Sequence, residues 1–444
     1  MQSSDSKSHL KRVCAAAIDG RTSNVRFIQS QLRILHQSIL DSREGILEVI
    51  AASSSNITNF KTEAEVEFSM AIATVREHYE GINFDRAITN EYKIAAGKNN
   101  AERRIGYGVV VVKPTMHTRF YAIVSAVACA IAAGNTFVVE CDKRAVDDLL
   151  PSLFQPLDWE IYALNQGPVT DDEILSTALT IDQTGEIETL HCVKSVPNLR
   201  SIAVIDRTAD VKKAAQQILA AHVAFSGQSP HAPDLIVVNE WVKNKFLEEI
   251  ILERTSATGR EVHSSHAGDD KHAAWKTALV EAESNGEATL IKKEGLYMID
   301  VHQRRPEYLV AYHFAEPAAG KFLSQQINSH WSFINHIPAQ LLVGPALPLK
   351  QQHFSLALRY TKEMLSKPRP EFVEEPIGNS AIELKDLINP MSTKLQILRQ
   401  RETQPLRETG QGPGTAIGFF EQGIIVETFT AFCRKGLWVL MFAL

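Results

Sequence analysis

Apolar residues recur every three or four positions in the first part of the chain. This spacing places them on one face of a helix and so predicts amphipathic helices between residues 25 and 80. The first stripe consists of Ile28, Leu32, Leu35 and Ile39, and the second of Phe68, Ile72, Val75 and Tyr79. Asp41 with Glu44, and Thr62 with Glu65, have the spacing of capping boxes and predict that helices begin there. We expect these helices to be scaffold without chemistry of their own.

A strand, a helix and a second strand are predicted between residues 107 and 140. Residues 107–113 form a β-branched run of the kind buried in a parallel sheet, and Pro114 ends it. Small residues follow at 118–133, with Gly134 as a C-terminal helix cap, and residues 136–140 form the next apolar run. Such a unit implies a right-handed crossover and a parallel sheet.

The pattern repeats further along the chain and predicts an α/β fold. Asp210 is placed to cap a helix that follows the apolar run at 201–205 and precedes a strand at 235–238. The buried stripe of that helix is expected to be Val211, Ala214, Ile218, Ala221 and Phe225. Further strands are predicted at 160–165, 189–195 and 310–314, and helices at 240–253 and 272–283. Residues 365–415, rich in proline and charge, are expected to be extended or a long loop.

Composition narrows the class of protein. The chain has 444 residues, of which 44% are hydrophobic and 22% charged, as is typical of globular proteins with a large core. A net charge of -6 gives no sign of nucleic-acid binding. Five cysteines without paired spacing favour a reducing compartment. Because the N-terminus is polar, without the apolar core of a secretory signal, we expect a cytoplasmic protein.

Two segments suggest other chemistry. His263 and His266 are the nearest approach to a metal pair, but their polar surroundings favour a solvated loop, so no metal site is predicted. The apolar residues 437–444 are far fewer than the ~20 that a spanning helix needs. They predict a terminal strand or an oligomer contact, with a lipid-touching tail as the alternative, and no membrane partner is expected.

Three motifs resemble those of the aldehyde dehydrogenase superfamily. Residues 130–136, Ala-Ile-Ala-Ala-Gly-Asn-Thr, repeat a superfamily turn almost letter for letter, and Ser201–Asp210 resembles a second segment. Gly227–Asp234 resembles the turn that carries the catalytic cysteine. The resemblance implies a Rossmann-like coenzyme domain at 1–200 and a catalytic α/β domain at 201–365. A C-terminal segment at 366–444 would add an extended loop and an oligomerisation strand, in a homodimer or homotetramer.

The resemblance fails at the residues that carry the superfamily's reaction. Pro230 stands in place of the nucleophilic cysteine, and a pyrrolidine ring cannot attack a carbonyl. His117 stands in place of the asparagine that stabilises the oxyanion. In an ungapped register Val196 stands in place of the general base, and a gap in the register would bring in Glu188 as the alternative.

The cofactor positions are also changed. Glu140 replaces the lysine that holds the adenosine ribose, and Gln303 replaces the glutamate that holds the nicotinamide ribose. The nearest counterpart of the Gly-Ser-Thr turn beneath the pyrophosphate is Asp171–Thr177, whose three acidic residues would oppose a phosphate. We therefore expect NAD and NADP binding to be lost, with no other cofactor.

Several functions remain open. His117 and His231 in one pocket could transfer protons near neutral pH, so one hypothesis is non-redox isomerisation or cyclisation of a small carbonyl compound, as in a biosynthetic pathway. The alternatives are a catalytically inactive scaffold, a module that binds a small molecule, and a residual NAD(P)-dependent aldehyde dehydrogenase with Cys192 as the nucleophile. The pocket around a small-molecule substrate is predicted to include Met116, Gln228, Pro230, Asn335 and His336.

Overall fold

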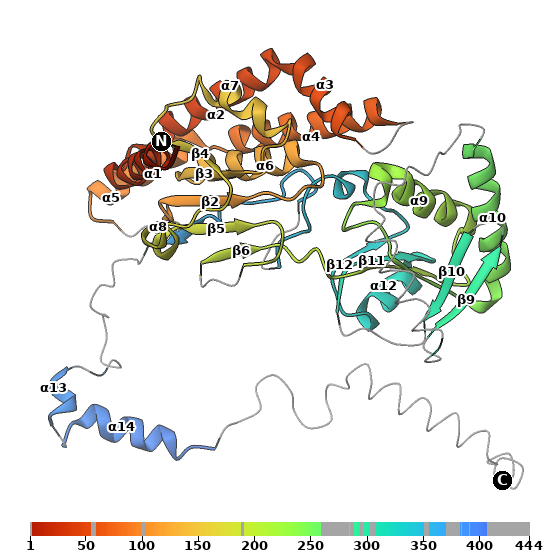
Figure 1. Ribbon diagram of the computed structural model, residues 1–444. Helices are drawn as coiled ribbons and strands as arrows, with labels where there is room; N and C mark the ends of the chain where they lie inside the picture. Colours follow the sequence, from red (N-terminus) through yellow and green to blue (C-terminus); the bar gives the residue numbers. More distant parts are fainter. Residues whose placement is uncertain are drawn as a thin grey trace, which may run out of the picture. The chain divides into compact units, whose positions relative to one another are not determined.

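Parallel strands organise the larger part of the protein, shown as a computed structural model in Figure 1. The structure describes residues 2–54, 59–98, 103–187, 191–258, 284, 288–293, 296–301, 307–349, 355–369, 382, 384–389 and 391–405. Residues 1–371 form one compact unit and residues 372–444 a second, and each is considered by itself. The domain boundaries expected from the sequence remain predictions.

The first sheet has five parallel strands in the order β4-β3-β2-β5-β6. They are β2 Val109–Lys113, β3 Thr136–Cys141, β4 Tyr162–Gln166, β5 Leu179–Asp182 and β6 Cys192–Lys194. The crossover helix α6 (Arg119–Ala132) is buried along its whole length, and Gly134 follows it with a φ of 76°. The βαβ unit predicted from residues 107–140 is confirmed.

Helices cover both faces of this sheet (Figure 1). Val110 and Val112 pack on one face with helices α2 (Val25–Asp41), α3 (Arg43–Ser53), α4 (Phe60–Glu80), α6 and α7 (Leu150–Phe154). Val109 and Val111 pack on the other face with α1 (Gln2–Asp19) and α8 (Asp172–Thr177). The alternation follows from the two-residue period of a strand. Helix α5 (Phe84–Ala95) completes the N-terminal helices.

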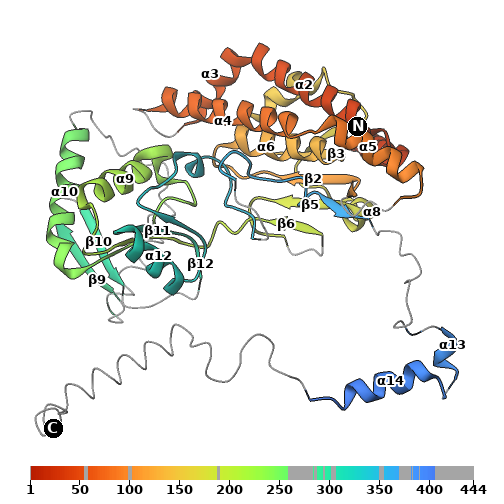
Figure 2. The same cartoon turned by 180° about the vertical axis from the view of Figure 1, so that it is seen from behind.

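The second sheet has four parallel strands in the order β12-β11-β7-β8. Figure 2 labels its strands β11 and β12. They are β7 Ser201–Ile205, β8 Leu235–Val238, β11 Tyr308–Phe314 and β12 Ser329–Ile334. Helices α9 (Val211–Val223) and α10 (Glu240–Thr258) cover one face, and α12 (Pro317–Gln326) covers the other. The strands β9 (Ala288–Lys293) and β10 (Leu296–Val301) pair as an antiparallel hairpin.

A small two-stranded sheet joins β1 (Arg104–Gly106) to β13 (Ser366–Pro368) in antiparallel pairing. Short 3-10 turns complete the described elements: Arg21–Ser23, Asp147–Leu149, Ala224–Gly227 and Ala339–Leu342. The fold is therefore α/β with two parallel sheets, as predicted.

Some local predictions were wrong. Helices α3 and α4 follow Ser42 and Asn59 as N-caps, so neither predicted capping box starts a helix. Phe225 does not continue the stripe of α9, because it lies in the turn after the helix with a φ of 50°. The segment expected to be extended after residue 365 contains the helices α13 (Leu384–Leu387) and α14 (Thr393–Glu402). The predicted helix 272–283 and the apolar residues 437–444 lie outside the described residues.

Candidate functional site

The carboxyl ends of β2 and β5 meet at the point where the first sheet reverses its strand order. The chain passes from β2 to β3 and β4 on one side and returns to β5 and β6 on the other. Ligands of open parallel sheets bind at this switch point, outside the carboxyl ends of the strands. Any cofactor site of this sheet is therefore expected between the turn after Lys113 and the turn after Asp182.

The turn after β5 is built around the buried carboxylate of Asp182, which is 0% exposed. One oxygen accepts from the backbone N–H and the hydroxyl of Thr184 and from Gly185 N, at 2.8–3.1 Å. The other accepts from Ile187 N at 2.7 Å. Backbone N–H groups in such a turn can hold a phosphate. Here a carboxylate of the chain itself accepts from three of them.

From the sequence, the counterpart of the pyrophosphate turn is expected at Asp171–Thr177, whereas the switch point of the sheet lies at the turn after β5. Asp171 accepts from Glu173 N at 3.1 Å and caps the short helix α8. The signal that could have located the other turn is Thr184-Gly185 directly after an apolar run. Gly185 has a φ of 76°, and a Cβ there would come within 2.9 Å of Ser195 O.

The predicted cofactor position Glu140 has a structural partner. Its carboxylate is 8% exposed at the end of β3 and accepts from Val169 N at 2.8 Å. Burial raises the pKa of this carboxyl, and the hydrogen bond from Val169 opposes that rise. Glu140 thus fixes the segment after β4. The second position, Gln303, lies outside the described residues.

A buried ion pair stabilises the same edge of the sheet. Arg119 Nε and Nη2 donate to the two carboxylate oxygens of Asp147 at 2.6 and 2.9 Å, and both side chains are at most 4% exposed. Asp142 N also donates to Asp147, at 2.7 Å. Each charge is therefore matched inside the protein, which buried charges require.

His117 lies just before α6, facing the segment that follows the second sheet. Its Nε2 donates to the Leu342 carbonyl at 2.8 Å, and its ring meets the Phe225 ring edge-on at a centroid distance of 5.6 Å. Burial, together with the charge of Arg359, lowers the pKa of His117 to about 4. The ring is neutral at pH 7 and its only N–H already has an acceptor, so it has no proton to give an oxyanion.

His231 is 0% exposed and contacts the same segment at Leu347. Its Nε2 accepts from Leu347 N at 3.4 Å, and its carbonyl accepts from the Tyr312 hydroxyl at 2.9 Å. Burial lowers the pKa of His231 well below its ordinary value, and the charge of Arg359 lowers it further. The structure thus brings the two predicted histidines together, but as neutral rings held by the backbone, with His231 fully enclosed.

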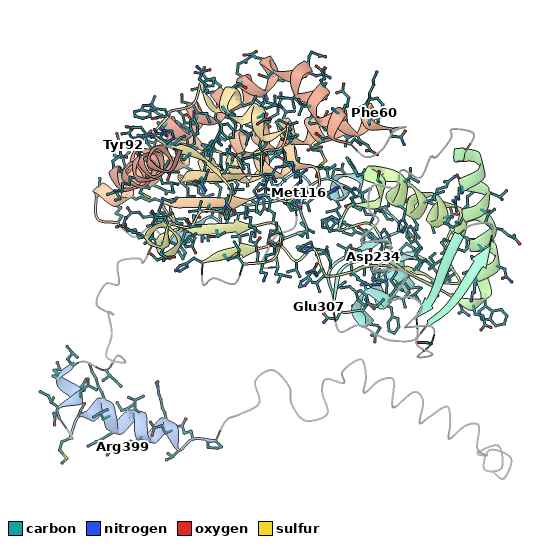
Figure 3. All side chains as sticks on the ribbon, viewed as in Figure 1. Phe60, Tyr92, Met116, Asp234, Glu307 and Arg399 are labelled. Carbon is teal, nitrogen blue, oxygen red and sulfur yellow. The ribbon has the colours of Figure 1, made fainter. Side chains whose placement is uncertain are left out.

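The remaining predicted pocket residues differ in exposure and in the groups that they contact. Pro230 is half-buried, and its carbonyl accepts from Ser201 Oγ at 2.9 Å. Gln228 is exposed. Met116 is 52% exposed beyond the end of β2 (Figure 3). Asn335 Oδ1 and Nδ2 bond to the backbone of Ala315, so that its amide joins the ends of β12 and β11. The fifth residue, His336, is exposed beside Phe333.

Arg359 is the residue of this region that the sequence analysis missed. It is 3% exposed, and only its Nη2 has a partner, the Val343 carbonyl at 2.6 Å. Its charge lowers the pKa of both His117 and His231. No sequence pattern pointed to it, because its neighbours come from distant parts of the chain.

The described residues contain neither a cluster of metal ligands nor a membrane-spanning helix. Within the described ranges, no three His, Cys, Asp or Glu side chains gather as a metal site would require. His263 and His266 lie outside those ranges. Among the described helices, none is long and apolar enough to cross a membrane.

Known proteins similar to this chain are aldehyde dehydrogenases. No protein-family model matches it. It is 22% identical over 265 residues to the 4,4'-diaponeurosporen-aldehyde dehydrogenase of Staphylococcus aureus, covering 55% of this chain and 57% of that protein. It is 23% identical over 286 residues to the dimeric NADP-preferring aldehyde dehydrogenase of Mus musculus, covering 59% and 62%. The chain thus matches somewhat over half the length of these relatives.

The solved structures agree with this. A substrate-bound state of Staphylococcus aureus AldH superposes with a TM-score of 0.63 at 16% identity, covering 89% of this chain and 99% of that one. The strand orders and the sequence matches at 22–23% identity lead to the same superfamily as the motifs. The chain therefore has the aldehyde dehydrogenase fold and is a divergent relative of the aldehyde dehydrogenase superfamily.

Proposed function

We propose that this chain does not oxidise aldehydes with NAD or NADP and acts as a catalytically inactive, ligand-binding relative of the aldehyde dehydrogenases. The observation that carries the proposal is the Asp182 carboxylate, which accepts from Thr184, Gly185 and Ile187 at the switch point. A dinucleotide phosphate placed there would meet a buried carboxylate, and the N–H groups that could hold it are already bonded. Pro230 at the position of the nucleophile adds a second, independent obstacle.

Non-redox acid/base chemistry finds less support. A proton-transfer pair needs a pKa near the working pH and access to a substrate. The pKa of His117 is lowered to about 4, and that of His231 is lowered well below its ordinary value. His231 is also fully buried. The isomerase or cyclase hypothesis therefore gives way to the inactive one, and a cytoplasmic homodimer or homotetramer remains the expected setting.

Calorimetric titration of the full chain with NAD and NADP tests the proposal. We expect no heat of binding at millimolar cofactor, and no absorbance at the wavelength of reduced nicotinamide when aliphatic and aromatic aldehydes are added. An aldehyde dehydrogenase that retains its cysteine serves as the positive control in both measurements. Saturable binding of either cofactor, or production of reduced nicotinamide, would refute the proposal.

A further inference from the structure

A cavity of about 270 Å³ lies between the helices α2 and α4, which pack in the layer over the first sheet. Its lining residues come from these two helices alone: Leu32, Arg33, His36, Arg76, Tyr79 and Glu80. On each helix the polar residues are three or four positions apart, so they share one helix face. Leu32 is 0% exposed and supplies an apolar wall, whereas both arginines are exposed. The cavity is therefore lined mainly by polar groups that a solute can reach.

The two arginines of this cavity differ from a third arginine in the same layer of helices. Arg43 on α3 contacts the carboxylates of Glu44 and Glu65, each at 2.7 Å. Among the described residues, no ion pair or side-chain hydrogen bond includes Arg33 or Arg76. Two guanidinium groups thus face one cavity with their N–H donors unused.

The other polar groups determine the net charge of the cavity. Burial lowers the pKa of His36, and the charge of Arg76 lowers it further, so the imidazole is neutral at pH 7. Tyr79 brings a hydroxyl, and Glu80 brings a single carboxylate. Two guanidinium groups and one carboxylate leave an excess of positive charge, which favours an anionic ligand.

We propose that this cavity binds a small phosphate monoester, with Arg33 and Arg76 holding the phosphate between them. A guanidinium donates two parallel N–H groups to phosphate oxygens in a planar fork. A phosphate monoester offers three acceptor oxygens and carries about -1.5 to -2 charges at pH 7, which two guanidinium groups match. Because cavities for drug-sized ligands span ~300–1,000 Å³, one of about 270 Å³ suits a short ester. The inference does not rest on the proposed function, since no lining residue belongs to the turns at Asp182 and Pro230.

Calorimetric titration of the full chain with glycerol 3-phosphate, in HEPES buffer at constant ionic strength, tests the site. We expect saturable binding at millimolar concentration, and none of glycerol or acetate under the same conditions. A tripeptide containing phosphoserine is the second phosphate arm. Tighter binding of the tripeptide would identify a phosphorylated protein as the source of the phosphate, and tighter binding of glycerol 3-phosphate would identify a metabolite. No saturable binding in either arm, or equal binding of acetate, would overturn the site.

Arginine variants test whether the phosphate lies in this cavity. Arg33→Gln and Arg76→Gln should each weaken binding about tenfold or more, because each removes hydrogen bonds to a charged ligand. The matched control is Arg26→Gln, an exposed arginine of α2 whose guanidinium lies 4.9 Å from the Phe84 ring centroid. It should bind as the wild type does. An unchanged affinity in both cavity variants, or an equal loss in Arg26→Gln, would contradict the site.

The carboxylate of the cavity provides a test in the opposite direction. Glu80→Gln removes the negative charge nearest the proposed phosphate and should strengthen binding about twofold to fivefold, the size expected for an exposed charge pair. An affinity that stays unchanged or falls would place the phosphate elsewhere.

The same variants keep this proposal separate from the loss of dinucleotide binding. NADP also carries a phosphate monoester, on the 2′ position of its adenosine ribose. Any heat with NADP that disappears in Arg33→Gln and Arg76→Gln would belong to this cavity. Heat that remains in both variants would count against the proposed function and leave the phosphate site standing.

Discussion

The edge of the first sheet at Asp182 and the cluster at Arg359 treat buried charge in opposite ways. At the first, Asp182 accepts from backbone N–H groups, and Arg119 is paired with Asp147. At the second, Arg359 retains two nitrogens without a partner, and His231 Nδ1 is also unpartnered. In the first region, the buried charges of Asp182, Arg119 and Asp147 all have partners within the protein. The second holds a buried guanidinium for which no ion pair is found among the described residues.

We propose that this difference separates a region that has replaced its ligand from one whose buried groups lack partners. Internal groups that replace a ligand's charge remove the need for the ligand, as we propose for the dinucleotide at Asp182. Buried groups without partners carry a cost in stability that a ligand can offset. His313 follows the second pattern, since both ring nitrogens lack partners and burial lowers its pKa to about 4.

The largest effect is expected from breaking the completed ion pair. Asp147→Asn leaves Arg119 buried without its main counter-charge and should lower the free energy of unfolding by about 3–5 kcal/mol, measured by urea denaturation. Asp142→Asn is the matched control, because Asp142 contacts Arg119 at 3.2 Å from a half-exposed position. It should cost about 1 kcal/mol or less. Equal losses in the two variants would contradict a buried, fully matched pair.

Glu67 is a buried carboxyl for which no ion pair is found among the described residues, and so it is the acidic counterpart of Arg359. Glu67 on α4 is 5% exposed and accepts from Tyr121 N at 3.1 Å. Burial raises its pKa to about 7, from an ordinary 4.5. The unfolded chain therefore loses this proton at lower pH than the folded chain, and stability should fall by about 3 kcal/mol as pH rises from about 4.5 to about 7.

Glu67→Gln should remove that fall and leave stability nearly level over the same pH range. Urea denaturation at several pH values measures it, with the exposed Glu80→Gln as control. If Glu67→Gln kept the wild-type slope, the carboxyl would not be the uncompensated group described here.

The fold could be predicted from the sequence because its signals are local. The valine run of β2, the small residues of α6 and Gly134 specify a βαβ unit within one short segment. Asp210 capped α9 as expected, accepting from Lys213 N at 3.2 Å. Helix starts were less predictable, since neither Ser42 nor Asn59 makes a side-chain cap.

The site could be predicted only in part, because its contacts join distant segments. The resemblance assigns the nucleophile's position to Pro230, and this assignment can be made from one turn of the chain. The charge state of His231 depends instead on burial and on Arg359, and the role of Asp182 depends on how the following turn folds back. No spacing in the sequence encodes these contacts.

The smallest effect is expected from restoring the missing nucleophile. Pro230→Cys places a thiol at the fourth position of the turn, yet it should produce no reduced nicotinamide from aldehydes and NAD above the wild-type background. The reason is that the thiol is only one of the parts required: the N–H groups at Asp182 remain bonded, and His117 has no proton to stabilise an oxyanion. Unfolding midpoints confirm that the variant is folded, and a thiol reagent reports whether the cysteine is accessible. Turnover by a folded variant would mean that the cofactor edge is not closed, and the contrast between the two regions would then disappear.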